Sequence, residues 1–154
     1  CQRVTEFTKK NCSSKIPNNI KFNDDDLKML NKFTDNLENL RNEIDNQNIN
    51  FYIDFVVNQL FEANKYFNDQ EPWKKKDNIE RLNSIVYTSL EVIRKITFLL
   101  YPIMPDTTIK VLNIFNLKEE HINFTSIGIH DYLNHGKPIN NIGILFKKIE
   151  KNND

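Results

Sequence analysis

The stretch DNIERLNSIVYTSLEVIRKITFLLY, residues 77–101, decides the fold. Its apolar residues recur at spacings of three and four, which is the period of an α-helix. The apolar stripe is wide, and we therefore predict the central helix of a bundle with other helices packed around it. The stripe consists of Ile79, Leu82, Ile85, Val86, Leu90, Ile93, Ile96, Leu99 and Leu100.

Helical periodicity also marks the segments on both sides of this helix. Pro102 and Pro105 force a turn after it, and a proline is tolerated in the first turn of a helix. The predicted elements are a helix over 1–12, a polar connector over 13–23, a helix from about Asp24 to Ile44, a helix over 51–67, a loop over 68–71, the central helix over 77–101 and a helix from about Asp106 to Phe115. The buried face predicted for the 51–67 helix comprises Ile53, Val56, Val57, Leu60, Ala63 and Phe67.

The composition agrees with a helical fold. Only 3 glycines and 5 prolines are present, which argues against a sheet-rich fold with many tight turns. We predict an all-α protein, with an antiparallel bundle of about five helices over residues 1–117. Residues 118–154 form an irregular tail that we expect to pack back on the bundle, with a short extended piece at 143–146.

Length and charge limit the function classes. A chain of 154 residues with 39% hydrophobic content is one domain with a real core, and its formal charge is zero. No global field attracts a polyanion, so any nucleic-acid contact must use a local patch. No apolar run of membrane-spanning length and no signal peptide is present, and we predict a cytoplasmic location.

The two cysteines and the first residues carry two further expectations. Cys1 and Cys12 are too far apart along one helix for a disulfide, so we predict buried, reduced thiols. The chain starts inside a helical pattern with no capping residue in front, and we expect a piece of a longer protein that carries the chemistry elsewhere.

The most informative surface feature follows the 51–67 helix. The single tryptophan, Trp73, stands behind Pro72 and ahead of Lys74, Lys75 and Lys76. A flat ring with cations beside it can stack on an unpaired base and hold the surrounding phosphates. The alternative is a tryptophan that plugs the bundle, followed by a solvated lysine run.

A family resemblance favours the first interpretation. The run Phe61-Glu62-Ala63-Asn64-Lys65-Tyr66-Phe67, followed by Pro72-Trp73-Lys74, resembles the anticodon-binding helical domain of methionyl-tRNA synthetases of bacterial type. Three further segments agree with that family in their order along the chain. They are Arg3 on the first helix, the turn Tyr101-Pro102-Ile103-Met104-Pro105, and Gly136-Lys137-Pro138 followed by Leu145-Phe146-Lys147-Lys148-Ile149-Glu150.

The resemblance implies a binding role and not a catalytic one. The parent enzyme would join methionine to its tRNA using ATP with magnesium, in a catalytic domain that precedes this segment. The signatures of that domain are absent here, so we expect no catalytic residue, metal or cofactor in this chain. The implied partners are methionine-accepting tRNA, through its CAU anticodon loop, and the catalytic domain, toward which the tail folds. Neither DNA nor a membrane is implied.

The resemblance also assigns roles to individual residues. In the family, the tryptophan at the position of Trp73 contacts the first anticodon base, and Pro72 fixes its backbone. Arg3 matches an arginine that reads the anticodon together with an asparagine, which would lie two residues before Cys1. Asn64 is expected to bond a neighbouring helix or to hold the Trp73 loop, and Lys74 and Lys75 to neutralise phosphates. Tyr66 is expected to be a packed ring with its hydroxyl at the surface.

Two alternatives remain open. One is a helical protein-interaction module with a buried tryptophan and no RNA partner. The other is the equivalent domain of a leucyl, isoleucyl, valyl or cysteinyl synthetase, which shares the bundle and the proline turn. Exposure of Trp73 on a basic face would favour RNA over the interaction module.

Overall fold

The computed structural model describes residues 1–142, and in this part of the chain it contains five α-helices and no strand beyond one isolated bridge. The predicted all-α class is confirmed. The helices are α1 (Gln2–Asn11), α2 (Asp24–Asp45), α3 (Ile49–Gln70), α4 (Ile79–Leu100) and α5 (Pro105–Leu112). Short 3₁₀ turns lie at η1 (Pro72–Lys74), η2 (Asn113–Phe115), η3 (Glu119–His121) and η4 (Thr125–Gly128). The pieces predicted at 143–146 and 145–150 lie outside the described residues.

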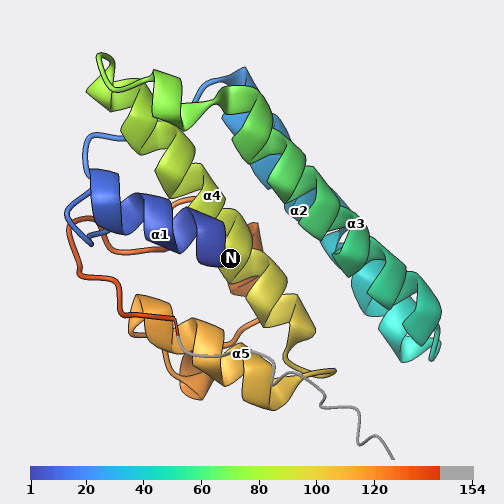
Figure 1. Cartoon of the computed structure of the whole chain (residues 1–154). Helices are drawn as coiled ribbons and strands as arrows, with labels where there is room; N and C mark the ends of the chain where they lie inside the picture. Colours follow the sequence, from blue (N-terminus) through green and yellow to red (C-terminus); the bar gives the residue numbers. More distant parts are fainter. Residues whose placement is uncertain (143–154) are drawn as a thin grey trace, which may run out of the picture.

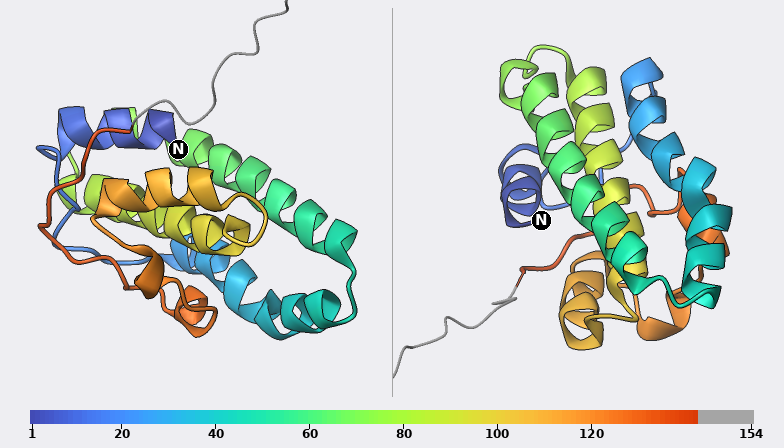
Figure 2. Two further views of the ribbon diagram at one scale, coloured as in Figure 1. Left: turned by 90° about the horizontal axis from the view of Figure 1, so that it is seen from below. Right: turned by 90° about the vertical axis from the view of Figure 1, so that its right-hand side faces the viewer.

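Helix α4 is the central element of the bundle (Figure 1). The hairpin of α2 and α3 packs along one side of it, α1 crosses it on the other side, and α5 packs near its carboxyl end. The two further views show the same arrangement, with α1 lying across α4 beside the end of α3 (Figure 2). Almost every residue between Leu82 and Leu99 is buried, so this helix is covered all round, as predicted.

Polar caps fix where the long helices begin. The Asn23 side chain accepts from the Asp26 N–H at 3.0 Å, and the Asp26 carboxylate accepts from the Asn23 N–H at 3.1 Å. This reciprocal pair is a capping box, which satisfies two backbone donors that have no partner within the helix. Asn48 and Asn78 cap α3 and α4 in a similar way, each through its side-chain oxygen. The Asp24-Asp25-Asp26 run thus lies at a helix amino terminus, as predicted.

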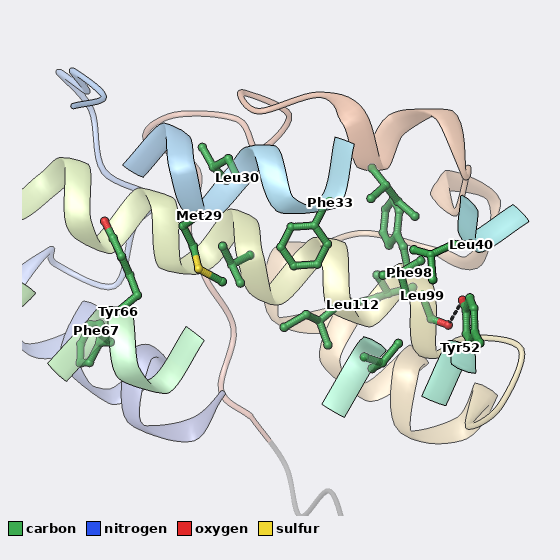
Figure 3. Close-up of a cluster of buried hydrophobic side chains, with 14 of the residues drawn as sticks. Met29, Leu30, Phe33, Leu40, Tyr52, Tyr66, Phe67, Phe98, Leu99 and Leu112 are labelled. Carbon is green, nitrogen blue, oxygen red and sulfur yellow. Dashed lines mark hydrogen bonds between the residues drawn. The ribbon is translucent and has the colours of Figure 1, made fainter. Parts of the chain in front are cut away.

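The main core lies between α2, α3 and α4 (Figure 3). Met29, Leu30 and Phe33 from α2 and Leu99 from α4 belong to this core, and the Tyr52 hydroxyl of α3 donates to the Leu99 carbonyl. Because buried tyrosines need a partner for the hydroxyl, this bond lets the whole ring enter the core.

Two predictions for α3 are wrong. Ile53, Val57 and Leu60 were expected inside, but they are 37–42% exposed. Val56 and Phe67 are buried as predicted, and Tyr52, Gln59 and Tyr66 complete the buried face. Apolar spacing alone missed part of this face, because two tyrosines whose hydroxyls have polar partners also lie on the core side. The helix is also longer than predicted and includes residues 68–70 of the expected loop.

Residues 118–142 pack against the bundle through buried Ile127, Leu133 and Ile139. The boundary at residue 117 and packing against a catalytic domain stay predictions.

Within α4, the fully buried Glu91 and Arg94 form an ion pair of 2.7 Å.

This buried pair binds the backbone of the segment that crosses α4. Glu91 accepts the N–H groups of Tyr132 and Leu133 at 2.7 and 2.6 Å. Arg94 donates to the Ser126 and Ile129 carbonyls. Buried charges are tolerated when they are paired and hydrogen-bonded, as they are here.

The cysteines differ from the prediction in one respect. Both are free thiols, but Cys1 is exposed and only Cys12 is half-buried. Burial raises the pKa of the Cys12 thiol to about 11, which makes it a poor nucleophile near neutral pH. Among the described helices, none combines the length and apolar character needed to cross a membrane.

Candidate nucleic-acid interface

The Pro-Trp pair lies in η1, immediately after α3. Glu71 ends α3 in the left-handed conformation, with φ of 44°, and this residue turns the chain out of the helix. Pro72 then occupies the first position of the 3₁₀ turn and is buried. The turn carries Trp73 at the surface with 37% of the residue exposed, while one edge of its ring meets Phe67 at 6.2 Å between centroids.

Arg3 reaches this tryptophan from α1. Its guanidinium carbon lies 5.2 Å from the centre of the Trp73 ring and 5.4 Å from that of Phe67. Both distances are in the range of a cation–π contact. Arg3 also donates to the Asn68 side-chain oxygen at 2.5 Å. Residues 65 positions apart in the chain therefore share one exposed site.

This arrangement offers three kinds of contact to a nucleotide. The partly exposed indole provides a stacking surface, the guanidinium provides planar donors, and the Asn68 amide can donate or accept. Phe67 connects the site to the core, because its ring also packs edge-on against the ring of Phe7 in α1, with 5.7 Å between the ring centroids.

Lys74 is the last residue of η1, and Lys75 and Lys76 follow it directly. Lys74 is exposed and pairs with Glu71 at 2.7 Å, whereas Lys75 is half-buried and Lys76 is exposed. A surface ion pair of this kind is worth little, so Lys74 can exchange Glu71 for a phosphate at small cost. The basic character of the turn is therefore local, in a chain with no net charge.

Asn64 and Tyr66 differ from their expected environments. The Asn64 side chain is exposed and borders a groove between α3 and the first turn of α1. Tyr66 was expected to have a surface hydroxyl, but the residue is buried and its hydroxyl donates to Asp26. Burial, followed by the Asp26 charge, raises the pKa of Tyr66 above its ordinary range.

A buried polar network behind the site was not predicted. Arg81 of α4 donates to both Asp26 carboxylate oxygens at 2.6 and 3.0 Å and to the Gln70 oxygen at 2.5 Å. With the Tyr66 hydroxyl bound to the same carboxylate, this network joins the start of α2, the end of α3 and the start of α4. It therefore fixes the last turns of α3, which carry Phe67 and Asn68. The Asn-Asp-Asp-Asp run signals the cap of α2, but nothing in it signals the burial of Asp26.

Groups suited to metal binding are missing from the described part of the chain, where no three His, Cys, Asp or Glu side chains gather.

The structure brings Arg3, Pro72, Trp73 and Lys74 together at one end of the bundle. Asn64 lies one helical turn away from Asn68 on α3.

A family model described as the anticodon binding domain of methionyl tRNA ligase matches residues 16–154. The chain belongs to this family. The predicted resemblance is thus confirmed, and the match favours it over the domains of the leucyl, isoleucyl, valyl and cysteinyl synthetases. Arg3 lies before the residues that the family model matches.

Similar proteins agree with the family assignment. The methionine–tRNA ligase of Mycobacterium leprae is 31% identical over 133 residues, covering 83% of this chain and 25% of its own length. The Thermotoga maritima ligase is 29% identical over 155 residues, covering 96% and 24%. The apo crystal structure of Mycobacterium tuberculosis methionyl-tRNA synthetase superposes with a TM-score of 0.86 at 26% identity, covering 97% of this chain and 31% of that one. The chain spans about a quarter of the length of these curated relatives.

Proposed function

We propose that this domain reads the CAU anticodon of methionine-accepting tRNA, as one part of a longer methionine–tRNA ligase. The observation that carries the proposal is the stacking of the Arg3 guanidinium over the exposed Trp73 indole. Family membership supports an anticodon-binding role, and this pair is the surface feature in the described chain best suited to an unpaired base.

Each part of the site has a distinct task in this proposal. Trp73 stacks on the first anticodon base, and Pro72 restricts its backbone so that little freedom is lost on binding. Arg3 bonds a base edge, while Lys74 and Lys75 face the phosphates of the loop. Asn64 supports the site from α3 and contacts the tRNA.

The remaining chemistry belongs to the rest of the ligase in this proposal. The relatives are methionine–tRNA ligases, and one solved relative is the Mycobacterium tuberculosis methionyl-tRNA synthetase in complex with methionyl-adenylate. ATP and magnesium would act in a catalytic domain attached to this one, in the cytoplasm. This domain would contribute tRNA recognition alone.

The test uses the fluorescence of Trp73, which is the only tryptophan. An anticodon stem-loop bearing CAU is titrated into the protein, and the same stem-loop with the first base changed to G is the control. We expect quenching of Trp73 emission, with tighter binding of CAU, because stacking brings a base onto the indole. Equal affinity for both stem-loops, with unchanged emission, would refute the proposal and favour a protein-interaction module.

A further inference from the structure

A cavity of about 650 Å³ opens among the loops that follow α1 and α5, and we call it the loop cavity. Three segments of the chain line it: residue 16, residues 115–121 and residues 132–138. None of them belongs to the candidate site around Arg3 and Trp73. Small-molecule sites in proteins commonly enclose roughly 300–1,000 Å³, so the loop cavity has room for a ligand of that size.

Hydrogen bonds between distant loops fix the walls of the loop cavity. The Ile16 N–H donates to the Lys137 carbonyl at 2.8 Å, and the Gly136 N–H donates to the Ile16 carbonyl at 2.7 Å. The Asn116 side chain donates to the Pro138 carbonyl at 2.9 Å. Figure 1 shows the connector after α1, in blue, beside the late segment in red. Because these walls are joined to one another in the folded chain, little ordering is needed when a ligand binds.

The floor of the loop cavity is apolar. Ile16, Phe115 and Leu133 line it, and all three belong to one buried core cluster. Tyr132 also lines the cavity, and its ring is held in place by the Arg94 guanidinium, whose carbon lies 4.4 Å from the ring centre. An apolar surface that includes aromatic rings suits the flat, weakly hydrated part of a ligand.

The polar groups around this floor are mainly donors without a partner. The Lys137 ammonium and the Asn134 side-chain amide make no hydrogen bond or ion pair within residues 1–142. The Lys118 N–H donates to His121 Nδ1 at 2.8 Å, so the ring proton of His121 resides on Nε2, which is a further donor. Of the described residues that line the cavity, none is acidic. The lining therefore favours an anion.

We propose that the loop cavity binds a nucleoside monophosphate. The phosphate accepts from Lys137 and His121, and the base lies on the apolar floor. The Asn134 amide, which both donates and accepts, matches the edge of a base. A bare phosphate would leave the floor uncovered, whereas an uncharged apolar ligand would leave the donors unpaired. A free nucleotide and an unpaired nucleotide of an RNA offer the same groups, and the proposal does not depend on how Trp73 acts.

A titration followed by NMR tests the proposal on residues 1–154. The probe is adenosine monophosphate (AMP), and inorganic phosphate and adenosine are the controls. The Gly136 amide lies in the wall of the cavity, whereas Gly128 lies in η4 and does not line it. We expect AMP to shift the Gly136 resonance saturably and to bind about tenfold more tightly than either control, because only AMP engages both floor and donors. Equal affinity for AMP and inorganic phosphate would overturn the proposal, as would an unshifted Gly136 resonance.

A matched pair of lysine substitutions locates the binding. Lys137→Gln removes the charge that lines the cavity, whereas Lys15→Gln removes the same charge from an exposed residue that does not line it. Losing a hydrogen bond to a charged group should weaken AMP binding about tenfold in Lys137→Gln, with less than about a twofold change in Lys15→Gln. Asn134→Asp adds a negative charge at nearly constant shape and should weaken AMP more than adenosine. Equal losses in the two lysine variants would reduce the binding to general surface charge and overturn the proposal.

The CAU stem-loop distinguishes the two sources of the nucleotide. If the stem-loop displaces AMP and shifts Gly136, an RNA nucleotide occupies the cavity, whereas simultaneous binding of both assigns it to a free nucleotide. Failure of AMP to bind would remove the loop cavity as a site and leave the Trp73 test of anticodon recognition unaffected. Equal affinity for the two stem-loops at Trp73, with AMP bound at Gly136, would do the reverse.

Discussion

The substitution Trp73→Ala separates recognition of the anticodon from folding. Its first effect is loss of the indole as a stacking surface, which is worth about 1–3 kcal/mol per base. At about 1.4 kcal/mol per decade, the affinity for a CAU stem-loop should fall by roughly five- to over a hundred-fold.

The cost to folding is smaller, because the indole is not a core side chain. Trp73 lies on a 3₁₀ turn with 37% of its surface exposed, and its ring contacts are an edge with Phe67 and the Arg3 guanidinium. An aromatic pair contributes about 0.5–1.5 kcal/mol beyond its buried area, so we expect destabilisation of about 1–2 kcal/mol and an intact fold.

Binding is measured by anisotropy of a labelled stem-loop, since the variant lacks intrinsic tryptophan emission. Trp73→Phe should recover part of the affinity because it keeps a stacking face. Phe61→Ala is the matched control, since Phe61 is an exposed aromatic residue of α3 away from η1. In the longer ligase, methionine activation without tRNA should stay near wild type. Unfolding of Trp73→Ala, or an equal fall in methionine activation and in tRNA charging, would refute the reasoning.

Three further predictions concern charged residues. Arg3→Lys should not restore the CAU preference lost in Arg3→Ala, measured with cognate and base-changed stem-loops, because an ammonium lacks the planar donors; full rescue would reduce Arg3 to a phosphate contact. Arg81→Met leaves the buried Asp26 carboxylate without its ion partner and should destabilise the fold by roughly 3–5 kcal/mol in urea unfolding, and a loss below about 1 kcal/mol would contradict the network. Burial, together with the nearby Arg94 charge, lowers the pKa of Lys95 from 10.5 to about 7. Between these two pH values the Lys95 amine is protonated in the unfolded chain and mostly neutral in the folded chain. Stability should therefore rise with pH from about 7 to about 10 in the wild type and rise less in Lys95→Met, as thermal unfolding across that range would show.

The sequence predicted the elements whose signals are local. The wide apolar stripe of 77–101 predicted a central helix, and α4 is buried all round. Asparagine and aspartate near residue 24 predicted the start of α2, because capping depends on residues within one turn. The Pro-Trp pair predicted a turn with an exposed ring, and η1 carries Trp73 at the surface.

Features that depend on distant contacts were missed. The buried face of α3 is set by how α2 and α4 approach it, so Tyr52 and Tyr66 enter the core while Leu60 stays partly outside. Glu91 and Arg94 lie in the most apolar helix, and their burial depends on backbone groups of residues 126–133. No spacing rule relates those residues, because they meet only in the folded chain.

The candidate site shows the same division. Trp73 and the lysines after it stand out in the sequence, but the contact between Arg3 and Trp73 joins two helical regions 70 positions apart in the numbering, a juxtaposition that only the family resemblance implied. Asn68, which accepts a hydrogen bond from Arg3, lies in a segment predicted to be a loop.

The formal net charge of the chain is zero, and the buried and local contacts described above hold the groups of the candidate site in place. In the proposed function, this domain has no basic field of its own to attract a tRNA loop over a long range, so its contribution to the affinity would come from groups held in place before binding. The Asp26 network fixes the end of α3, this end positions Phe67 and Asn68, and these two residues hold Arg3 beside Trp73. Arginine otherwise loses considerable side-chain entropy on binding, and part of that loss has already occurred in the folded domain. In the proposed function, the domain would select a base by shape and donor geometry, while Lys74 and the two lysines that follow it would add only a local electrostatic contribution.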